Sequence, residues 1–153
     1  MKVIKAPAFV SDRLAAIFLA GSIEMGVAEN WQQKAERLLS DTHWTLLNPR
    51  RDDWDSTWEQ KISNPAFNEQ VSWELQGLET CEKVIVYFDP NTKSPITLLE
   101  LGLLSQLKEP ADIFVICPEP FYRKGNVDIV CDRYRIKQYK TLEEVCEVLK
   151  RVH

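Results

Sequence analysis

Glu100 is the residue of this sequence whose position most clearly suits chemistry. It lies in the stretch "SPITLLELG" (94–102), which is typical of a helix. At about 100° per residue, Ile96, Leu104 and Leu107 fall on the side of that helix that carries Glu100. Carboxylates are rarely buried without a partner or a purpose, so an apolar face that includes Glu100 indicates a functional group.

Glu74 is the second candidate, and it directly follows Trp73 in the predicted helix "VSWELQGLET". Alone, Glu74 is typical of an exposed surface residue. Paired with Glu100, it completes the two carboxyl groups that retaining glycosyl transfer requires, one as nucleophile and one as proton donor. The nucleophile must be ionised, whereas the acid must keep its proton near neutral pH. Burial beside an aromatic ring and a second negative charge favours the protonated acid.

Apolar stretches alternate with helical patterns along the chain. The pattern predicts strands over 15–21, 44–49, 83–90, 112–118 and 128–134. It predicts helices over 28–39, 68–81, the stretch that carries Glu100, and 142–152. Alternation of this kind implies right-handed crossovers and a parallel sheet. We therefore expect one α/β domain over residues 1–153, doubly wound, with a mostly parallel five-stranded sheet and helices on both faces.

In an open α/β sheet, ligands bind beyond the carboxyl ends of the strands. Polar groups follow four of the predicted strands, at Gly21–Ser22, Asn48–Arg51, Asp89–Ser94 and 118–126. We expect Glu100, two turns into its helix, to point into the same crevice. The sequence therefore predicts a site where these segments meet.

Two segments near this crevice have more than one interpretation. The turn "GSIEMG" (21–26) lacks the spacing of a P-loop or a dinucleotide fingerprint, so its glycines suit either a tight turn or close approach of a flat ligand. The loop "NPRRDDWDSTW" (48–58) is typical of a solvated loop whose aspartates and arginines pair with one another. It also suits a lid with a tryptophan face for stacking a base.

The composition excludes several classes of function. A formal net charge of −4 gives no basic surface for a nucleic-acid polymer. The apolar run over 14–21 is too short to span a membrane. The four cysteines are far apart and have no nearby histidine, which favours reduced thiols in a cytoplasmic protein over a metal site. We expect neither a metal nor an organic cofactor.

Four motifs, taken in order, resemble the nucleoside 2-deoxyribosyltransferase family. They are "FLAGSI" (18–23), "NPRR" (48–51), "WE" (73–74) and "SPITLLELG" (94–102), and the likeness spans roughly residues 16–135. The closest likeness is to the branch that carries the NPRR and WE signatures. The resemblance implies a flavodoxin-like sheet and a glutamate that attacks C1′ of a deoxynucleoside, holding the sugar as an ester until an acceptor base or water releases it. Glu100 matches this nucleophile, and Glu74 matches the acid that protonates the base.

The resemblance leaves the substrate open. Transferases of the family often carry an aspartate six residues before the nucleophile, where this chain has Ser94, as do relatives that hydrolyse nucleoside 5′-monophosphates. Those hydrolases carry an arginine after "GSI", where this chain has Glu24, and a carboxylate would repel a phosphate. Family sites are commonly completed by a polar residue from a neighbouring subunit. Asn126 is the candidate here, which implies a homo-oligomer with shared active sites.

The sequence thus predicts a nucleoside deoxyribosyltransferase that acts on a small nucleoside or nucleotide. A hydrolase of nucleoside 5′-monophosphates or of an NAD-type N-glycosidic bond is the first alternative, and a non-catalytic nucleotide-binding module is the second. The catalytic candidates are Glu100 and Glu74. The candidates for substrate binding are Gly21, Ser22, Asn48, Arg50, Trp73, Asp89, Ser94 and Asn126.

Overall fold

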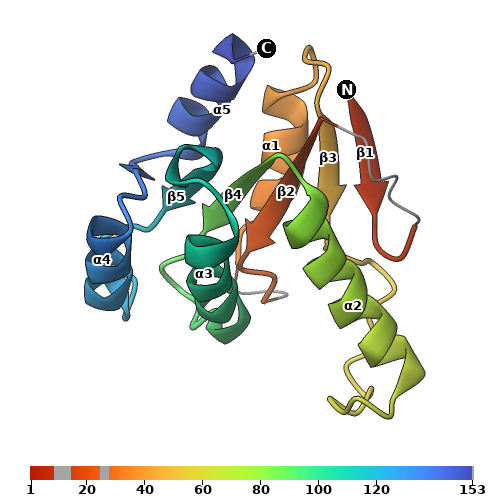
Figure 1. Ribbon diagram of the computed structural model, residues 1–153. Coiled ribbons are helices and arrows are strands. Elements are labelled where there is room, and N and C mark those ends of the chain that lie inside the picture. Colours follow the sequence, from red (N-terminus) through yellow and green to blue (C-terminus); the bar gives the residue numbers. More distant parts are fainter. Residues whose placement is uncertain (9–14, 25–27, 153) are drawn as a thin grey trace.

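The computed structural model describes residues 1–8, 15–24 and 28–152, which form one sheet covered by helices (Figure 1). All six strands are parallel and lie in the order β1-β3-β2-β4-β5-β6. Their bounds are Lys2–Lys5 (β1), Ala16–Gly21 (β2), Thr45–Asn48 (β3), Lys83–Tyr87 (β4), Ile113–Ile116 (β5) and Gln138–Tyr139 (β6). Apart from the edge strand β1, this order is the flavodoxin-like one.

Helices cover both faces of the sheet, which confirms the doubly wound prediction (Figure 1). Their bounds are Trp31–Leu38 (α1), Pro65–Thr80 (α2), Pro95–Leu107 (α3), Lys124–Arg133 (α4) and Leu142–Arg151 (α5), with a short 3₁₀ turn at Pro110–Asp112. Helices α1 and α5 pack on one face, and α2, α3 and α4 pack on the other.

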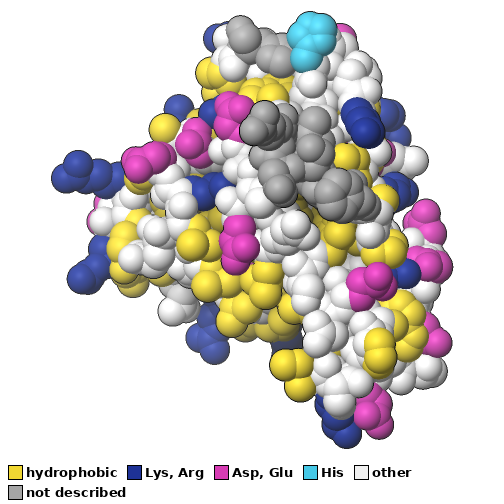
Figure 2. Space-filling view, turned by 45° about the vertical axis from the view of Figure 1, so that its right-hand side comes forward, with side chains coloured by type: hydrophobic (Ala, Val, Ile, Leu, Met, Phe, Trp, Pro, Cys, Tyr) yellow, Lys and Arg dark blue, Asp and Glu magenta, His cyan; other side chains and the backbone are white. Residues whose placement is uncertain are grey.

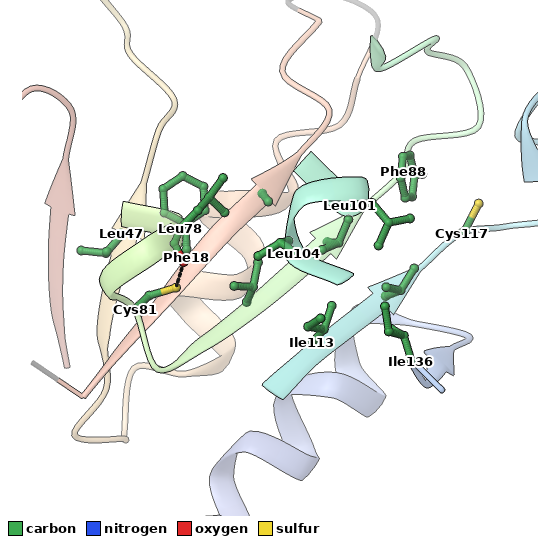
Figure 3. Packing of buried hydrophobic residues seen from close by; sticks show 14 of the residues in the cluster. Phe18, Leu47, Leu78, Cys81, Phe88, Leu101, Leu104, Ile113, Cys117 and Ile136 are labelled. Carbon is green, nitrogen blue, oxygen red and sulfur yellow. Dashed lines mark hydrogen bonds between the residues drawn. The ribbon is translucent and has the colours of Figure 1, made fainter. Parts of the chain in front are cut away.

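The central strands are buried on both faces because successive side chains enter different cores. In β2, Ile17 and Leu19 pack with α1 and α5, whereas Phe18 and Ala20 pack with α2, α3 and α4. Figure 3 shows the second of these cores, in which Leu101 of α3 lies above the sheet. Burial on both faces explains why these strands appear as continuous apolar runs in the sequence.

Three predictions about the elements were wrong. The strand predicted over 128–134 is part of α4, because Val127, Val130 and Cys131 share one helical face that packs against the core. Two strands were missed, β1 beside β3 and the two-residue β6 beside β5, so the sheet has six strands and not five.

Helix α3, which carries Glu100, begins in an unexpected way. Ser94 stands at the N-cap position with φ 45° and ψ 54°, in the left-handed region, and its side chain does not cap the helix. Pro95 occupies the first helical position, as its missing N–H allows. Ile96 and Leu107, expected beside Glu100 on the buried face, are instead 59% and 53% exposed.

Candidate active site

Glu100 is a carboxyl group buried in the described part of the chain. It is one of the buried residues of α3 and is only 7% exposed. Burial, and after it the negative charge of Glu74 on α2, raise the pKa of its carboxyl from 4.5 to about 8. The prediction that Glu100 is buried is therefore confirmed, and the negative charge of Glu74 acts on its carboxyl group.

Glu74 is half-buried, and a neighbouring amide holds its carboxyl group in place. Burial raises the pKa of Glu74, while a 2.7 Å hydrogen bond that Gln70 Nε2 donates to Glu74 Oε1 opposes the rise. Gln70 Nε2 also donates to the carbonyl of Pro49 at 3.0 Å, which anchors the amide to the segment after β3. Sequence reasoning missed Gln70, although its position four residues before Glu74 on the same helix was a usable signal.

The order of the two pKa values differs from the order that the sequence suggested. The larger rise falls on Glu100, the expected nucleophile, because it is the more buried group and only Glu74 among its neighbours carries charge. Two carboxyl groups coupled in this way titrate as a pair. Above the raised pKa of Glu74 and below about pH 8, the pair holds one proton.

A second cluster joins the end of β2 to the loop between β4 and α3. Ser22 Oγ hydrogen bonds with Thr92 Oγ1 at 3.0 Å and with Ser94 Oγ, and it accepts the backbone N–H of Asp89 at 2.9 Å. Thr92 and Ser94 also hydrogen bond to each other at 2.7 Å. The structure therefore brings the predicted residues Ser22, Ser94 and Asp89 together, but it engages the two serine hydroxyls within the protein.

Two carboxylates, those of Asp89 and Glu24, also hold this loop in place. Asp89 accepts the backbone N–H groups of Glu29 at 3.0 Å and of Asn91 at 2.8 Å. Glu24 Oε1 accepts those of Lys93 and Ser94, each at 3.1 Å. Of the predicted turn 21–26, the last two residues lie outside the described ranges.

Four of the predicted substrate-binding residues contact other parts of the protein itself. Asn48 donates a 2.7 Å hydrogen bond to Glu36 on α1, and Arg50 donates one of 3.4 Å to Gln32, also on α1. Both side chains thus reach the helix on the other face of the sheet. Trp73 packs in the core against Phe18, and its Nε1 donates to the carbonyl of Ala8 at 2.8 Å.

Gly21 is the fourth of these residues, and its neighbours explain why it is a glycine. A Cβ atom there would lie 2.5 Å from the carbonyl oxygen of Tyr87 and 2.6 Å from the ring of Trp31. These distances are too short for any side chain. The groups that approach Gly21 closely are therefore the backbone of Tyr87 and the ring of Trp31, both within the protein.

The polar loop after β3 pairs its own charges, as one interpretation of the sequence expected. Arg51 forms two 2.9 Å hydrogen bonds with the carboxylate of Asp53, and its guanidinium lies 5.3 Å from the ring centre of Trp58. Arg51 also donates to Gln70 Oε1 at 3.5 Å, so this loop supports the amide that holds Glu74. The lid remains a prediction.

Asn126 lies on the exposed surface of α4, where it lines a groove of about 290 Å³ together with Leu98 and Leu101 of α3. A second groove, of about 260 Å³, lies near the Trp31–Tyr87 stack on the α1 side. Glu100 and Glu74 line neither groove. Asn126 of the same chain therefore does not line a common groove with the carboxyl pair.

No group of three or more His, Cys, Asp or Glu side chains suited to a metal ion occurs within the described ranges. All four cysteines are buried free thiols. No described helix has the length and apolar character needed to cross a membrane.

The profile of the nucleoside 2-deoxyribosyltransferase-like family matches residues 15–121, which is more than half of the chain. The chain belongs to this family. A comparison with curated proteins gave no match. The matched range includes both glutamates of the pair and ends before α4.

The buried pair leads to a prediction about stability. A carboxyl whose pKa is raised on folding costs no stability while it is protonated, and it costs progressively more as pH rises from its unfolded value of 4.5 to about 8. Each pKa unit corresponds to about 1.4 kcal/mol, so Glu100→Gln should gain on the order of 4 kcal/mol relative to wild type between pH 4.5 and pH 8.5. Denaturant unfolding at both pH values measures the gain.

The matched control is Glu79→Gln, which removes an exposed carboxylate from the same helix as Glu74. This variant should follow wild type at both pH values. An equal stability difference between Glu100→Gln and wild type at pH 4.5 and pH 8.5 would contradict the raised pKa.

Proposed function

We propose that this protein cleaves the N-glycosidic bond of a 2′-deoxyribonucleoside and transfers the deoxyribosyl group to another base. The observation that carries this proposal is the burial of Glu100, which is 7% exposed, together with Glu74 on the neighbouring helix, the pKa values of both carboxyl groups being raised. Burying two carboxyl groups whose negative charges repel each other opposes folding, so such groups are characteristic of functional sites. Family membership supports the reaction class.

The pair supplies the charge and the proton that the first half-reaction needs. As the C1′–N bond breaks, its electrons pass to the base nitrogen, which takes the proton of the pair from Glu74. An oxygen of Glu100 forms the new bond to C1′, which gives a glycosyl ester. Before substrate binds, the proton of the pair is on Glu100. The positive charge that develops at C1′ favours an ionised Glu100, so at this stage the proton is on Glu74.

The second half-reaction returns the pair to its starting state. Glu74, now ionised, takes a proton from the acceptor base as the nitrogen of that base attacks C1′. The ester bond to Glu100 breaks and its electrons return to the carboxylate. Gln70 is a positioning residue in both steps, because its amide holds Glu74 Oε1 at 2.7 Å.

Base exchange tests this proposal. Wild type incubated with a deoxynucleoside and a different free base should form the second deoxynucleoside, as measured by liquid chromatography. Glu100→Gln should lose about a thousandfold or more of this rate because an amide is a poor nucleophile. Glu74→Gln should lose about a hundredfold or more because it cannot protonate the base. The control Glu79→Gln should match wild type.

Hydrolysis and binding without turnover give different results in the same assay. Free base released equally with and without an acceptor would show that water takes the sugar, and the transfer proposal would fail. Unchanged exchange in Glu100→Gln would overturn the role of Glu100. No reaction in the wild type with any deoxynucleoside would leave a binding module as the better description.

We also propose that a second copy of the chain packs beside this site. Four large apolar side chains on α3 are exposed and follow one helical stripe: Ile96, Leu99, Leu103 and Leu107. Figure 2 shows hydrophobic side chains gathered on part of the molecular surface. The stripe lies on the helix that carries Glu100, so a second copy packed on it would shield the site from water. It would also bring a polar residue, such as Asn126 of the partner subunit, within reach of the substrate.

Light scattering after size-exclusion chromatography tests the assembly. Wild type at micromolar concentration should run as a dimer or larger, whereas Leu99→Glu should shift toward the monomer and lose base-exchange activity. Ile62→Glu is the control, since Ile62 is 87% exposed in the loop before α2 and lies outside the stripe. A monomeric, fully active wild type would overturn the assembly without affecting the roles of Glu100 and Glu74.

A further inference from the structure

The groove of about 260 Å³ on the α1 side has no part in the proposed reaction, because Glu100 and Glu74 do not line it. Residues that follow four of the parallel strands line it together. They include Lys34 after β2, Tyr87 and Pro90 at the end of β4, Pro118 after β5 and Lys140 after β6. This space is called the Tyr87 groove below.

The strand order places the Tyr87 groove where ligands bind in folds of this kind. Strand β3 lies on one side of β2 and β4 lies on the other, so the direction in which the chain winds reverses between β2 and β4. In open α/β sheets, ligands bind outside the carboxyl ends of the strands at such a reversal. Lys34 of α1 and Tyr87 of β4 line the groove from the two sides of this point.

Tyr87 gives the groove a rigid aromatic surface. Its ring stacks on that of Trp31, with ring centres 4.9 Å apart and an angle of 14° between the planes. Trp31 is fully buried, and its Nε1 donates to the carbonyl of Ser22 at 3.1 Å, which fixes the stack. Burial, and after it the charges of nearby carboxylates, raise the pKa of Tyr87, so its hydroxyl keeps its proton and can donate a hydrogen bond.

The size and walls of the groove suit a small flat molecule. Pro90 and Pro118 line it after β4 and β5, and a proline offers apolar surface without a backbone N–H. A space of about 260 Å³ is at the small end of ligand pockets, so it suits one or two fused rings and is too small for a dinucleotide.

The charges around the groove balance. Within the described ranges its lining carries two lysines, Lys34 and Lys140, and two carboxylates, Glu29 and Glu143. Lys34 and Glu143 form a 2.6 Å ion pair between α1 and α5, while Glu29 and Lys140 are exposed. The lining thus offers both hydrogen-bond donors and acceptors, with no excess of either charge.

The start of α5, at one side of the groove, does not suit a phosphate. The first turn of a helix attracts anions, but this turn already holds the carboxylates of Glu143 and Glu144. Glu144 Oε2 also accepts the backbone N–H of Lys140 at 2.9 Å. A phosphate would therefore meet like charges here.

Asp89 holds the edge of the groove in place. Its Oδ2 accepts the backbone N–H of Glu29 at 3.0 Å, and its own N–H donates to Ser22 Oγ at 2.9 Å. Asp89, which the sequence predicted to bind substrate, thus positions a residue of the Tyr87 groove.

We infer that the Tyr87 groove is a second binding site and that its ligand is a free nucleobase. A nucleobase is planar and uncharged, and its edge carries both donors and acceptors. Its ring packs against Tyr87 and the two prolines, while Glu29 and Lys140 bind its edge. The inference does not depend on the proposed function.

NMR titration of isotope-labelled protein with free adenine or free cytosine tests the inference. The backbone amide signals of Lys34, Tyr87 and Glu143 should shift on binding. Tyr87→Leu removes the aromatic ring and should weaken the affinity roughly tenfold or more, as expected for the loss of one stacking partner. Glu29→Ala and Lys140→Met change exposed residues only, and each should weaken the affinity roughly threefold or more. The spectrum of each variant shows that it is folded, and the two exposed positions keep the test valid if Tyr87→Leu does not fold.

Tyr134→Leu is the matched control, since Tyr134 is 37% exposed at the end of α4 and lines neither groove. This variant should bind adenine as tightly as wild type. Glu100→Gln should also retain binding, because Glu100 does not line the Tyr87 groove. Adenosine 5′-monophosphate should bind no more tightly than adenine.

The outcomes separate this inference from the catalytic proposal. Shifts confined to residues around Glu74 and Glu100, no shift with millimolar adenine or cytosine, or an affinity that all three groove variants leave unchanged would each overturn the inference. A monophosphate that binds more tightly than adenine, with the advantage lost in Lys140→Met, would overturn it as well. Shifts in the groove of a wild type that does not exchange bases would support the inference and count against the catalytic proposal alone.

Discussion

The burial of Glu100 beside Glu74 is the constraint on which the account of this molecule depends. A carboxyl group with a pKa of about 8 in the folded chain is stable there only while it carries a proton. Glu100 is 7% exposed on the helix whose Leu101 and Leu104 enter the core, and its low contact with water strengthens the electrostatic effect that it would have on a substrate. The property that costs stability is therefore the property on which the proposed glycosyl transfer relies.

The loops at the carboxyl edge of the sheet fix the two helices that carry the pair. Gln70 ties Glu74 to the segment after β3 through the carbonyl of Pro49. Ser22 ties the end of β2 to the loop that begins α3. These buried hydrogen bonds contribute about 1 kcal/mol each to stability, but their larger effect is on position, because a shift of either loop would move one carboxyl group relative to the other.

Much of this arrangement could be predicted from the sequence. The continuous apolar runs of β2 and β4 predicted a parallel sheet, since strands buried on both faces have no alternation. Glu100 was identified because it falls on the apolar face of its helix, where a carboxylate without a partner or a function is rare. The strand predicted over 128–134 was wrong because a short apolar run does not distinguish a buried strand from the buried face of a helix.

The parts that the sequence did not predict depend on contacts between distant segments. Glu24 and Ser94 are separated by 70 residues, and no local pattern indicates that the carboxylate of one binds the N–H of the other. The exposed positions of Ile96 and Leu107 likewise follow from how α3 is rotated against the sheet. The order of the two pKa values depends on relative burial and on the amide of Gln70, which only the packed structure specifies.

The covalent bond to Glu100 is the most direct consequence of the proposed mechanism. We would incubate wild type with a deoxynucleoside and no acceptor, quench with acid, and map peptides by mass spectrometry. The account predicts a deoxyribosyl ester on the peptide that contains Glu100, with the modification on that side chain and absent from Glu100→Gln. An ester on another residue, or rapid base exchange with no ester on any peptide, would contradict it.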